Sequence, residues 1–283
     1  MAFKTNVEDR VSTYPGRVVL TPVSGEKNTY DMVRADVPIT EGTPINKKLF
    51  DGKADTLTGN VTVYVSTKGN NASGTGSSDA PFATIQAAIN ALPKYFGGYN
   101  VTIDIASGTY DERVSINNFV GGTLSIGVLG RSVTVRGLYI SGCPKVELNI
   151  QYLTKTSSFG GPVLSATNGS NVILVSSIQV DGNNDNVSGI SAINFSSVYA
   201  NTGVTVGVSK CYGAAVIAER CSFVSLDTIS GTDNVAGMSA TRGGIISYKT
   251  NSMTNMWGNI ADTGGLVLTG ANSSDLSGAT LDL

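Results

Sequence analysis

From about residue 120 onward, short runs of aliphatic residues alternate with clusters of Gly, Asn and Ser at nearly regular intervals. Each repeat has an apolar residue, two variable residues, a pair of small residues and then a strand-like run. The apolar anchors are Ala166, Ile193, Ala218, Ala240 and Ala261, and their successive residue numbers differ by 27, 25, 22 and 21. One turn of a parallel β-helix takes roughly 20 to 30 residues. The pattern therefore predicts a β-solenoid in which the five anchors occupy equivalent inward positions.

Shorter alternating runs precede these repeats and have the period of two that half-buried strands show. We expect strands at Val61–Val65, Val101–Ile105, Val114–Ile116, Thr123–Ile126, Val133–Val135 and Val146–Leu148. These strands would form the first coils of the same solenoid.

One segment, about Thr84 to Leu92, has a helical pattern between Pro81 and Pro93. Its apolar residues follow the i, i+3, i+4, i+7 spacing of a helix face and are Ile85, Ala88, Ile89 and Leu92. We expect this helix to cover the open N-terminal end of the solenoid and its unpaired strand edge. The alternative is a βα unit of a doubly wound sheet, but no second helical pattern follows to continue it.

Residues 1–56 differ from the rest because they have no helical or alternating pattern of any length. Short extended pieces, such as Arg17–Thr21, lie between proline and glycine residues. Burial of the few apolar side chains in this stretch does not offset the conformational entropy that the stretch would lose on ordering. We therefore predict an extended N-terminal attachment arm over residues 1–56, ordered by a partner, and a β-helix domain over residues 57–283. A flexible tail, or a strand packed on its own domain, is the alternative.

Composition narrows the function classes. Of 283 residues, 34 are glycines and 14% are charged, which fits an all-β protein with many tight turns. The net charge is -2, and no Lys or Arg lies between Lys155 and Lys210, so we expect no nucleic acid partner.

The first ten residues carry charges and no apolar run reaches membrane-spanning length. We expect synthesis in a cytoplasm without a signal peptide, and no membrane insertion.

The chain contains no histidine, which removes Ser-His and Cys-His nucleophiles and His-ligated zinc. Cys143, Cys211 and Cys221 form no CxxC motif, and we expect them to be buried thiols that pack as small apolar side chains. Asp181–Asp185 begins like a calcium loop, but Asn186 stands where the loop needs Gly and Ala192 where it needs Glu. We interpret it as an Asx-rich turn, and we predict no metal, cofactor or catalytic residue.

Two catalytic arrangements are known from β-helix enzymes. Glycosidases need paired carboxylates, and the candidates here are Asp181, Asp185, Asp227 and Asp233. Lyases use an Arg base beside an acidic calcium cluster, and the candidates for that base are Arg220 and Arg242, which share one phase of the repeat. No acidic cluster shares that phase, so we expect these arginines to be solvated. Four aromatic residues are candidates either for stacking on a sugar or for packing against a neighbouring coil or subunit. They are Tyr199, Tyr212, Tyr248 and Trp257.

Three segments, Tyr64–Asn70, Ala80–Ile89 and Val101–Tyr110, resemble the opening of pectate-lyase-like right-handed β-helix domains of phage tail fibre, tailspike and related virion proteins. The N-terminal stretch is similar to the head of such proteins from phages and prophages of Gram-positive bacteria. That similarity lies in Gly16–Pro22, Asp31–Asp36 and Gly42–Asn46.

The resemblance implies an all-β, right-handed parallel β-helix in a virion component of the tail, fibre, spike or baseplate region. It implies a homotrimer that binds other tail proteins through the arm and displays the β-helix outward, with a structural or host-surface-binding function toward a cell-surface glycan. The alternatives are a polysaccharide depolymerase, either lyase or glycosidase, and a bacterial adhesin. Residues 272–283 include no helix to close the far end of the solenoid, which also favours association.

Overall fold

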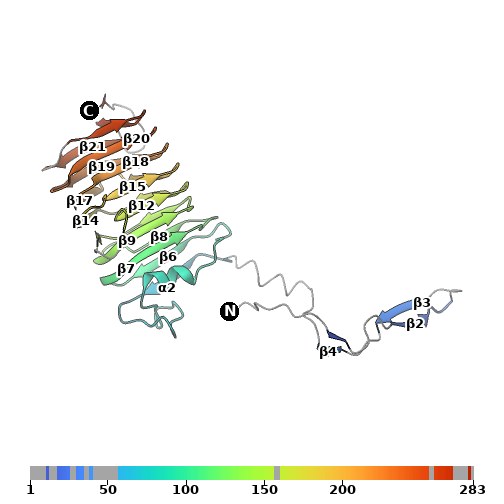
Figure 1. The fold of residues 1–283 in the computed structure, drawn as a ribbon. Helices are drawn as coiled ribbons and strands as arrows, with labels where there is room; N and C mark the ends of the chain where they lie inside the picture. Colours follow the sequence, from blue (N-terminus) through green and yellow to red (C-terminus); the bar gives the residue numbers. More distant parts are fainter. Residues whose placement is uncertain are drawn as a thin grey trace. The chain divides into compact units, whose positions relative to one another are not determined.

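The computed structural model describes residues 11–12, 18–25, 30–34, 38–40, 57–155, 160–254, 258–269 and 280–281 (Figure 1). The chain divides into two units, Met1–Asp55 and Thr56–Leu283. In the described residues of the first unit, β1 (Val11–Ser12) pairs antiparallel with β4 (Pro38–Thr40), and β2 (Val18–Pro22) pairs antiparallel with β3 (Tyr30–Arg34). Of the extended piece expected at Arg17–Thr21, Val18–Thr21 therefore lie in a strand of a local pair, and Arg17 lies outside the described residues. The role of this unit as an attachment arm stays a prediction.

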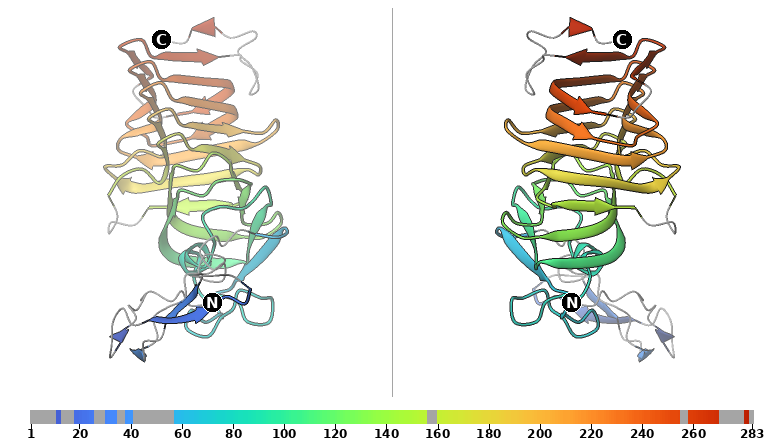
Figure 2. Two further views of the ribbon diagram at one scale, coloured as in Figure 1. Left: turned by 90° about the vertical axis from the view of Figure 1, so that its right-hand side faces the viewer. Right: turned by 90° about the vertical axis from the view of Figure 1, so that its left-hand side faces the viewer.

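The second unit is a right-handed parallel β-helix with three sheets, which confirms the predicted fold class (Figures 1 and 2). The first sheet contains β5 (Val61–Val65), β6 (Val101–Ile105), β8 (Leu124–Ile126), β10 (Val146–Leu148), β13 (Asn171–Leu174), β16 (Ser197–Ala200), the first halves of β19 (Phe223–Gly231) and β21 (Ile245–Met253), and β23 (Leu266–Thr269).

The second sheet contains the first halves of β7 (Gly108–Asn117) and β9 (Val133–Ser141), then β11 (Tyr152–Thr154), β14 (Ile178–Asp185), β17 (Thr205–Cys211) and the second halves of β19 and β21. The third contains the second halves of β7 and β9, then β12 (Leu164–Thr167), β15 (Ile190–Ile193), β18 (Ala214–Glu219), β20 (Ala236–Thr241) and β22 (Ile260–Asp262). Each coil from β6 to β22 thus crosses all three sheets.

The strand pairing in the third sheet shows that one of the five predicted anchors does not face inward. Ala166 pairs with Ala192, Ala192 with Ala218, Ala218 with Ala240, and Ala240 with Ala261. The prediction that Ile193 faces inward is wrong, because a slip of one residue along a strand turns a side chain to the opposite face. Ile193 lies between Thr167 and Glu219 on the outer face, whereas Ala192 is fully buried.

The second and third residues after each inward alanine form the corner between the third and first sheets. At this corner two consecutive residues have left-handed backbone angles, with φ between +50° and +79°. These corner residues are Asn168 and Gly169, Asn194 and Phe195, Arg220 and Cys221, Arg242 and Gly243, and Thr263 and Gly264.

A buried serine follows the corner in three successive coils. The hydroxyl of Ser170 accepts the backbone N–H of Cys143 at 3.2 Å, and Ser196 accepts that of Ser170 at 3.2 Å. Ser222 accepts the N–H of Ser196 at 3.1 Å. Because buried N–H groups are costly to leave unpaired, this ladder explains the small polar residue at that place in the repeat.

The N-terminal end of the solenoid is covered by α2 (Ile85–Asn90), which confirms the predicted capping helix. The carboxylate of Glu112 on β7 accepts the N–H groups of Ile85 at 2.7 Å and Gln86 at 3.0 Å, so a strand caps the helix. The side-chain amide of Gln86 accepts the N–H of Ser115 at 2.7 Å and donates to its carbonyl at 3.1 Å. Gln86 thereby takes the place of a neighbouring strand at the first edge of the third sheet.

At the other end, β24 (Thr280–Leu281) pairs antiparallel with β23, joining Leu281 to Leu268 and Thr280 to Thr269 (Figure 2). This short strand covers part of the last rung, although residues 272–283 were expected to provide no cover. Among the described residues, no helix is both long enough and apolar enough to cross a membrane.

Candidate functional site

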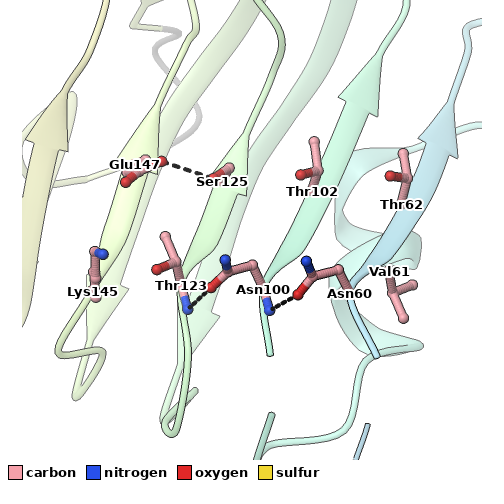
Figure 3. A pocket seen from close by; sticks show the side chains of 9 residues that line it. All are labelled: Asn60, Val61, Thr62, Asn100, Thr102, Thr123, Ser125, Lys145 and Glu147. Carbon is pink, nitrogen blue, oxygen red and sulfur yellow. Dashed lines mark hydrogen bonds between the residues drawn. The ribbon is translucent and has the colours of Figure 1, made fainter. Parts of the chain in front are cut away.

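A polar groove lies on the outer surface of the first sheet, across its four N-terminal strands β5, β6, β8 and β10 (Figure 3). Its volume is about 340 Å³. Because successive strands of the sheet lie about 4.8 Å apart, residues far apart in the sequence line it together. They are Asn60, Val61, Thr62, Asn100, Thr102, Thr123, Ser125, Lys145 and Glu147.

Two asparagines of the groove bind the backbone of the next strand. Asn60 Oδ1 accepts the N–H of Asn100 at 2.9 Å, and Asn100 Oδ1 accepts the N–H of Thr123 at 3.2 Å (Figure 3). These hydrogen bonds use the amide oxygens and fix both side chains. Each Nδ2 group therefore points away from the hydrogen bond that the oxygen of the same amide accepts (Figure 3). The groove therefore presents amide donors at the spacing of adjacent strands.

The remaining polar groups add hydroxyls and one charge of each sign. Ser125 Oγ donates to Glu147 Oε2 at 3.0 Å, and Lys145 directly precedes β10, two residues before Glu147. Glu147 is the one carboxylate among the residues that line the groove. Glycoside hydrolysis by the usual route needs two. The groove can hydrogen-bond a polar, hydroxyl-rich ligand, but its lining residues do not provide an acid and base pair.

The Asp181–Asp185 segment lies at the corner between the second and third sheets, away from the groove. Asp181 Oδ1 accepts the N–H of Asn183 at 2.7 Å, which forms an Asx turn. Asp181 Oδ2 lies 3.2 Å from Lys210 Nζ, and Asp185 Oδ2 lies 3.8 Å from the buried Lys155 Nζ. The described part of the chain contains no group of three or more acidic, Cys or His residues suited to a metal ion.

The other two candidate carboxylates are not brought to this corner as a pair. Asp227 is 8% exposed and accepts the N–H of Gly203 at 2.9 Å, so it stabilises the preceding turn. Asp233 follows the end of β19 and has a φ of +60°. Asp227 and Asp233 thus flank opposite ends of the segment that β19 contributes to the second sheet.

Arg220 and Arg242 stack on successive coils, as their shared phase predicts, at the corner between the third and first sheets. Both bind the carboxylate of Glu219, with Arg220 Nη2 3.6 Å from Oε1 and Arg242 Nη1 hydrogen-bonded to the same oxygen. Both arginines are exposed. The single glutamate at this corner does not form the acidic cluster that a calcium-dependent lyase site requires.

The candidate aromatic residues are dispersed. Tyr248 is 4% exposed within the core, which excludes it as a stacking surface. Tyr199 is half-buried on the outer face of the first sheet, and Tyr212 is 50% exposed at the corner that holds Asp185. Trp257 lies outside the described residues.

The cysteines divide by position. Cys143 and Cys211 are buried, but the prediction that all three are buried is wrong for Cys221, which is exposed because it occupies a left-handed corner position. Burial raises the pKa of the Cys143 thiol. Burial, reinforced by the negative charge of Asp181, raises the pKa of Cys211 to about 12.

Comparisons with protein-family models, with curated proteins and with solved structures find no match for this chain.

Proposed function

We propose that this chain is a structural and host-surface-binding component of a phage tail or tail-like particle, of the fibre, spike or baseplate-associated kind. The polar groove carries the proposal, because its fixed amide donors and hydroxyls suit a cell-surface glycan and its lining holds a single carboxylate. A separate N-terminal unit, Met1–Asp55, supports attachment to other tail proteins, as the sequence resemblance implies. The chain would work as a homotrimer, exposed on the virion.

Binding and location are tested separately. Antibody labelling of purified particles in the electron microscope should place the protein on the tail. Deleting residues 1–56 should leave a folded β-helix that no longer joins the particle. Protein found only free in the lysate would contradict the proposal.

A polysaccharide depolymerase is the second candidate, because Glu147 and Lys145 lie together in a groove of hydroxyl-rich lining. Incubation with host cell-wall and capsular polysaccharides, with and without calcium, should release no new reducing ends or unsaturated products. Product release that disappears in Glu147→Gln would favour the depolymerase. The matched control is Glu219→Gln, which alters the glutamate of the arginine corner instead.

A further inference from the structure

Three large side chains are exposed together at the corner that leads into the polar groove. The segment between α2 and β6 runs beside the segment between β7 and β8 there, with Tyr95 paired parallel to Val120. Tyr95 is 51% exposed, Val120 41% and Tyr99 39%. We call these three residues the tyrosine patch.

The tyrosine patch adjoins the polar groove along the chain. Tyr99 directly precedes Asn100, and Val120 lies three residues before Thr123. Asn100 and Thr123 both line the groove and are joined by a hydrogen bond (Figure 3). Consecutive Cα atoms lie about 3.8 Å apart, so the patch begins within one residue of the groove lining.

Backbone hydrogen bonds and a glycine hold the patch in place. The N–H of Phe96 donates to the carbonyl of Val120 at 2.9 Å, and the N–H of Val120 donates to the carbonyl of Lys94 at 2.9 Å. A methyl group at Gly121 would lie 2.6 Å from Cδ2 of Tyr95, so the ring packs closely on this backbone only because the residue is glycine. A ring held in this way loses little conformational entropy when it contacts a ligand.

Other aromatic residues fill the core beneath the patch. Phe96 and Phe119 are both buried, and their rings stack with centroids 5.6 Å apart. Tyr95 and Tyr99 lie outside this core, so packing of the interior does not explain why they are aromatic. Exposed apolar side chains that gather beside convergent polar groups are typical of a binding site.

We propose that the tyrosine patch and the polar groove form one binding site for a glycan of pyranose rings. A pyranose ring carries C–H groups on its faces and hydroxyls around its rim, so it matches a flat aromatic side chain beside hydrogen-bonding groups. The patch provides the rings of Tyr95 and Tyr99. In the groove, the hydroxyls of Thr62 and Thr102 have no hydrogen-bond partner among the described residues, so they are free to bond to sugar hydroxyls.

The position of the groove favours a glycan over an extended peptide. A peptide that adds to a sheet pairs its backbone with an open strand edge. The groove instead lies on the face of the first sheet, across four strands that are already paired with one another. Its contacts to a ligand therefore come from side chains.

The inference rests on the proposed function in one respect, that the chain binds the host surface. Sedimentation of the full chain with cell walls purified from the host bacterium tests it. The wild-type protein should bind these walls, should still bind them after protease treatment, and should lose binding after periodate oxidation, which cleaves the vicinal diols of sugars.

Tyr95→Ala and Tyr99→Ala should each weaken binding by about 3- to 10-fold, because each removes one aromatic contact. Tyr99→Phe keeps the ring and should bind like the wild type. Thr102→Val removes a groove hydroxyl at nearly constant shape and should also weaken binding. The matched control is Tyr152→Ala, at a 43% exposed tyrosine on β11 of the second sheet, and it should bind like the wild type.

Thermal unfolding first establishes that each variant is folded. If Tyr95→Ala does not fold because its ring packs on Gly121, Tyr99→Ala and Thr102→Val provide the same test. Unchanged binding by folded Tyr99→Ala would overturn the inference and leave host-surface binding intact. Equal loss in Tyr152→Ala, or binding that protease abolishes and periodate does not, would also overturn it. A wild-type protein that does not bind the walls would contradict both this inference and host-surface binding, whereas particle labelling tests the tail location separately.

Discussion

The register of the third sheet makes neighbouring residues of β15 respond very differently to one substitution. Ala192 is fully buried and stacks between Ala166 and Ala218, whereas the adjacent Ile193 lies on the outer face between Thr167 and Glu219. Replacing each in turn by asparagine tests which of the two faces the core.

The cost at Ala192 has two parts. An asparagine there adds three non-hydrogen atoms where neighbouring coils place methyl groups, and overpacking costs about 1 to 3 kcal/mol. Its amide would also be buried without a partner, at about 1 to 3 kcal/mol. We therefore expect Ala192→Asn to lower the free energy of unfolding by about 4 kcal/mol. For a unit of this size that corresponds to a fall in Tm of about 8 to 16 °C.

Ile193→Asn enters a column that already holds polar side chains, so it should cost about 1 kcal/mol or less. Thermal unfolding followed by far-UV circular dichroism compares the two variants at equal concentration. Equal falls in Tm, or a larger fall for Ile193→Asn, would refute the register argument.

Three further outcomes are expected. Glu112→Ala removes the acceptor of two helix N–H groups and should cost about 1 to 2 kcal/mol in chemical unfolding, whereas Asp111→Ala, which breaks an exposed ion pair with Arg136, should cost less than about 1 kcal/mol. Iodoacetamide at neutral pH should label Cys221 alone in the native protein and all three cysteines after denaturation, as read by peptide mass; native labelling of Cys211 would contradict its burial. The pKa of the Cys211 thiol is about 12 in the folded protein, whereas the ordinary thiol value is 9.0. The stabilisation from the buried, protonated thiol is therefore present below about pH 9 and is lost as the pH rises toward 12. Cys211→Ala should make this fall in stability shallower in urea titrations at successive pH values.

The sequence was most informative where local pattern and tertiary structure agree. The strand at Val101–Ile105 has the predicted bounds, and the predicted helix lies where its apolar spacing and flanking prolines indicated. The predicted repeat is out of register in one coil because Ala192 and Ile193 are both apolar, and because Phe195 occupies a corner position that holds glycine or Cys221 in the other coils. Spacing alone does not distinguish these alternatives, whereas strand pairing does.

The groove was not predicted, because its residues come from four segments that the sequence does not place side by side. The acidic residues that the sequence singles out include Asp181 and Asp185, which lie beside lysines at another corner. A usable signal was present in the outward positions of the predicted strands, where Thr62, Thr102 and Ser125 alternate with apolar residues. Aligning those strands by their inward residues would have collected the polar column.

The serine ladder gives the solenoid a modular length. Asn171 pairs with Ser197, so residues 171–196 form one coil whose removal would join Ser170 directly to Ser197. The hydroxyl of Ser222 could then accept the N–H of Ser170, as it now accepts that of Ser196. The rod would shorten by one strand spacing, about 4.8 Å, while the capping helix and the terminal strand β24 stay in place. Gain or loss of whole coils therefore offers an evolutionary route to rods of different reach with the same two ends.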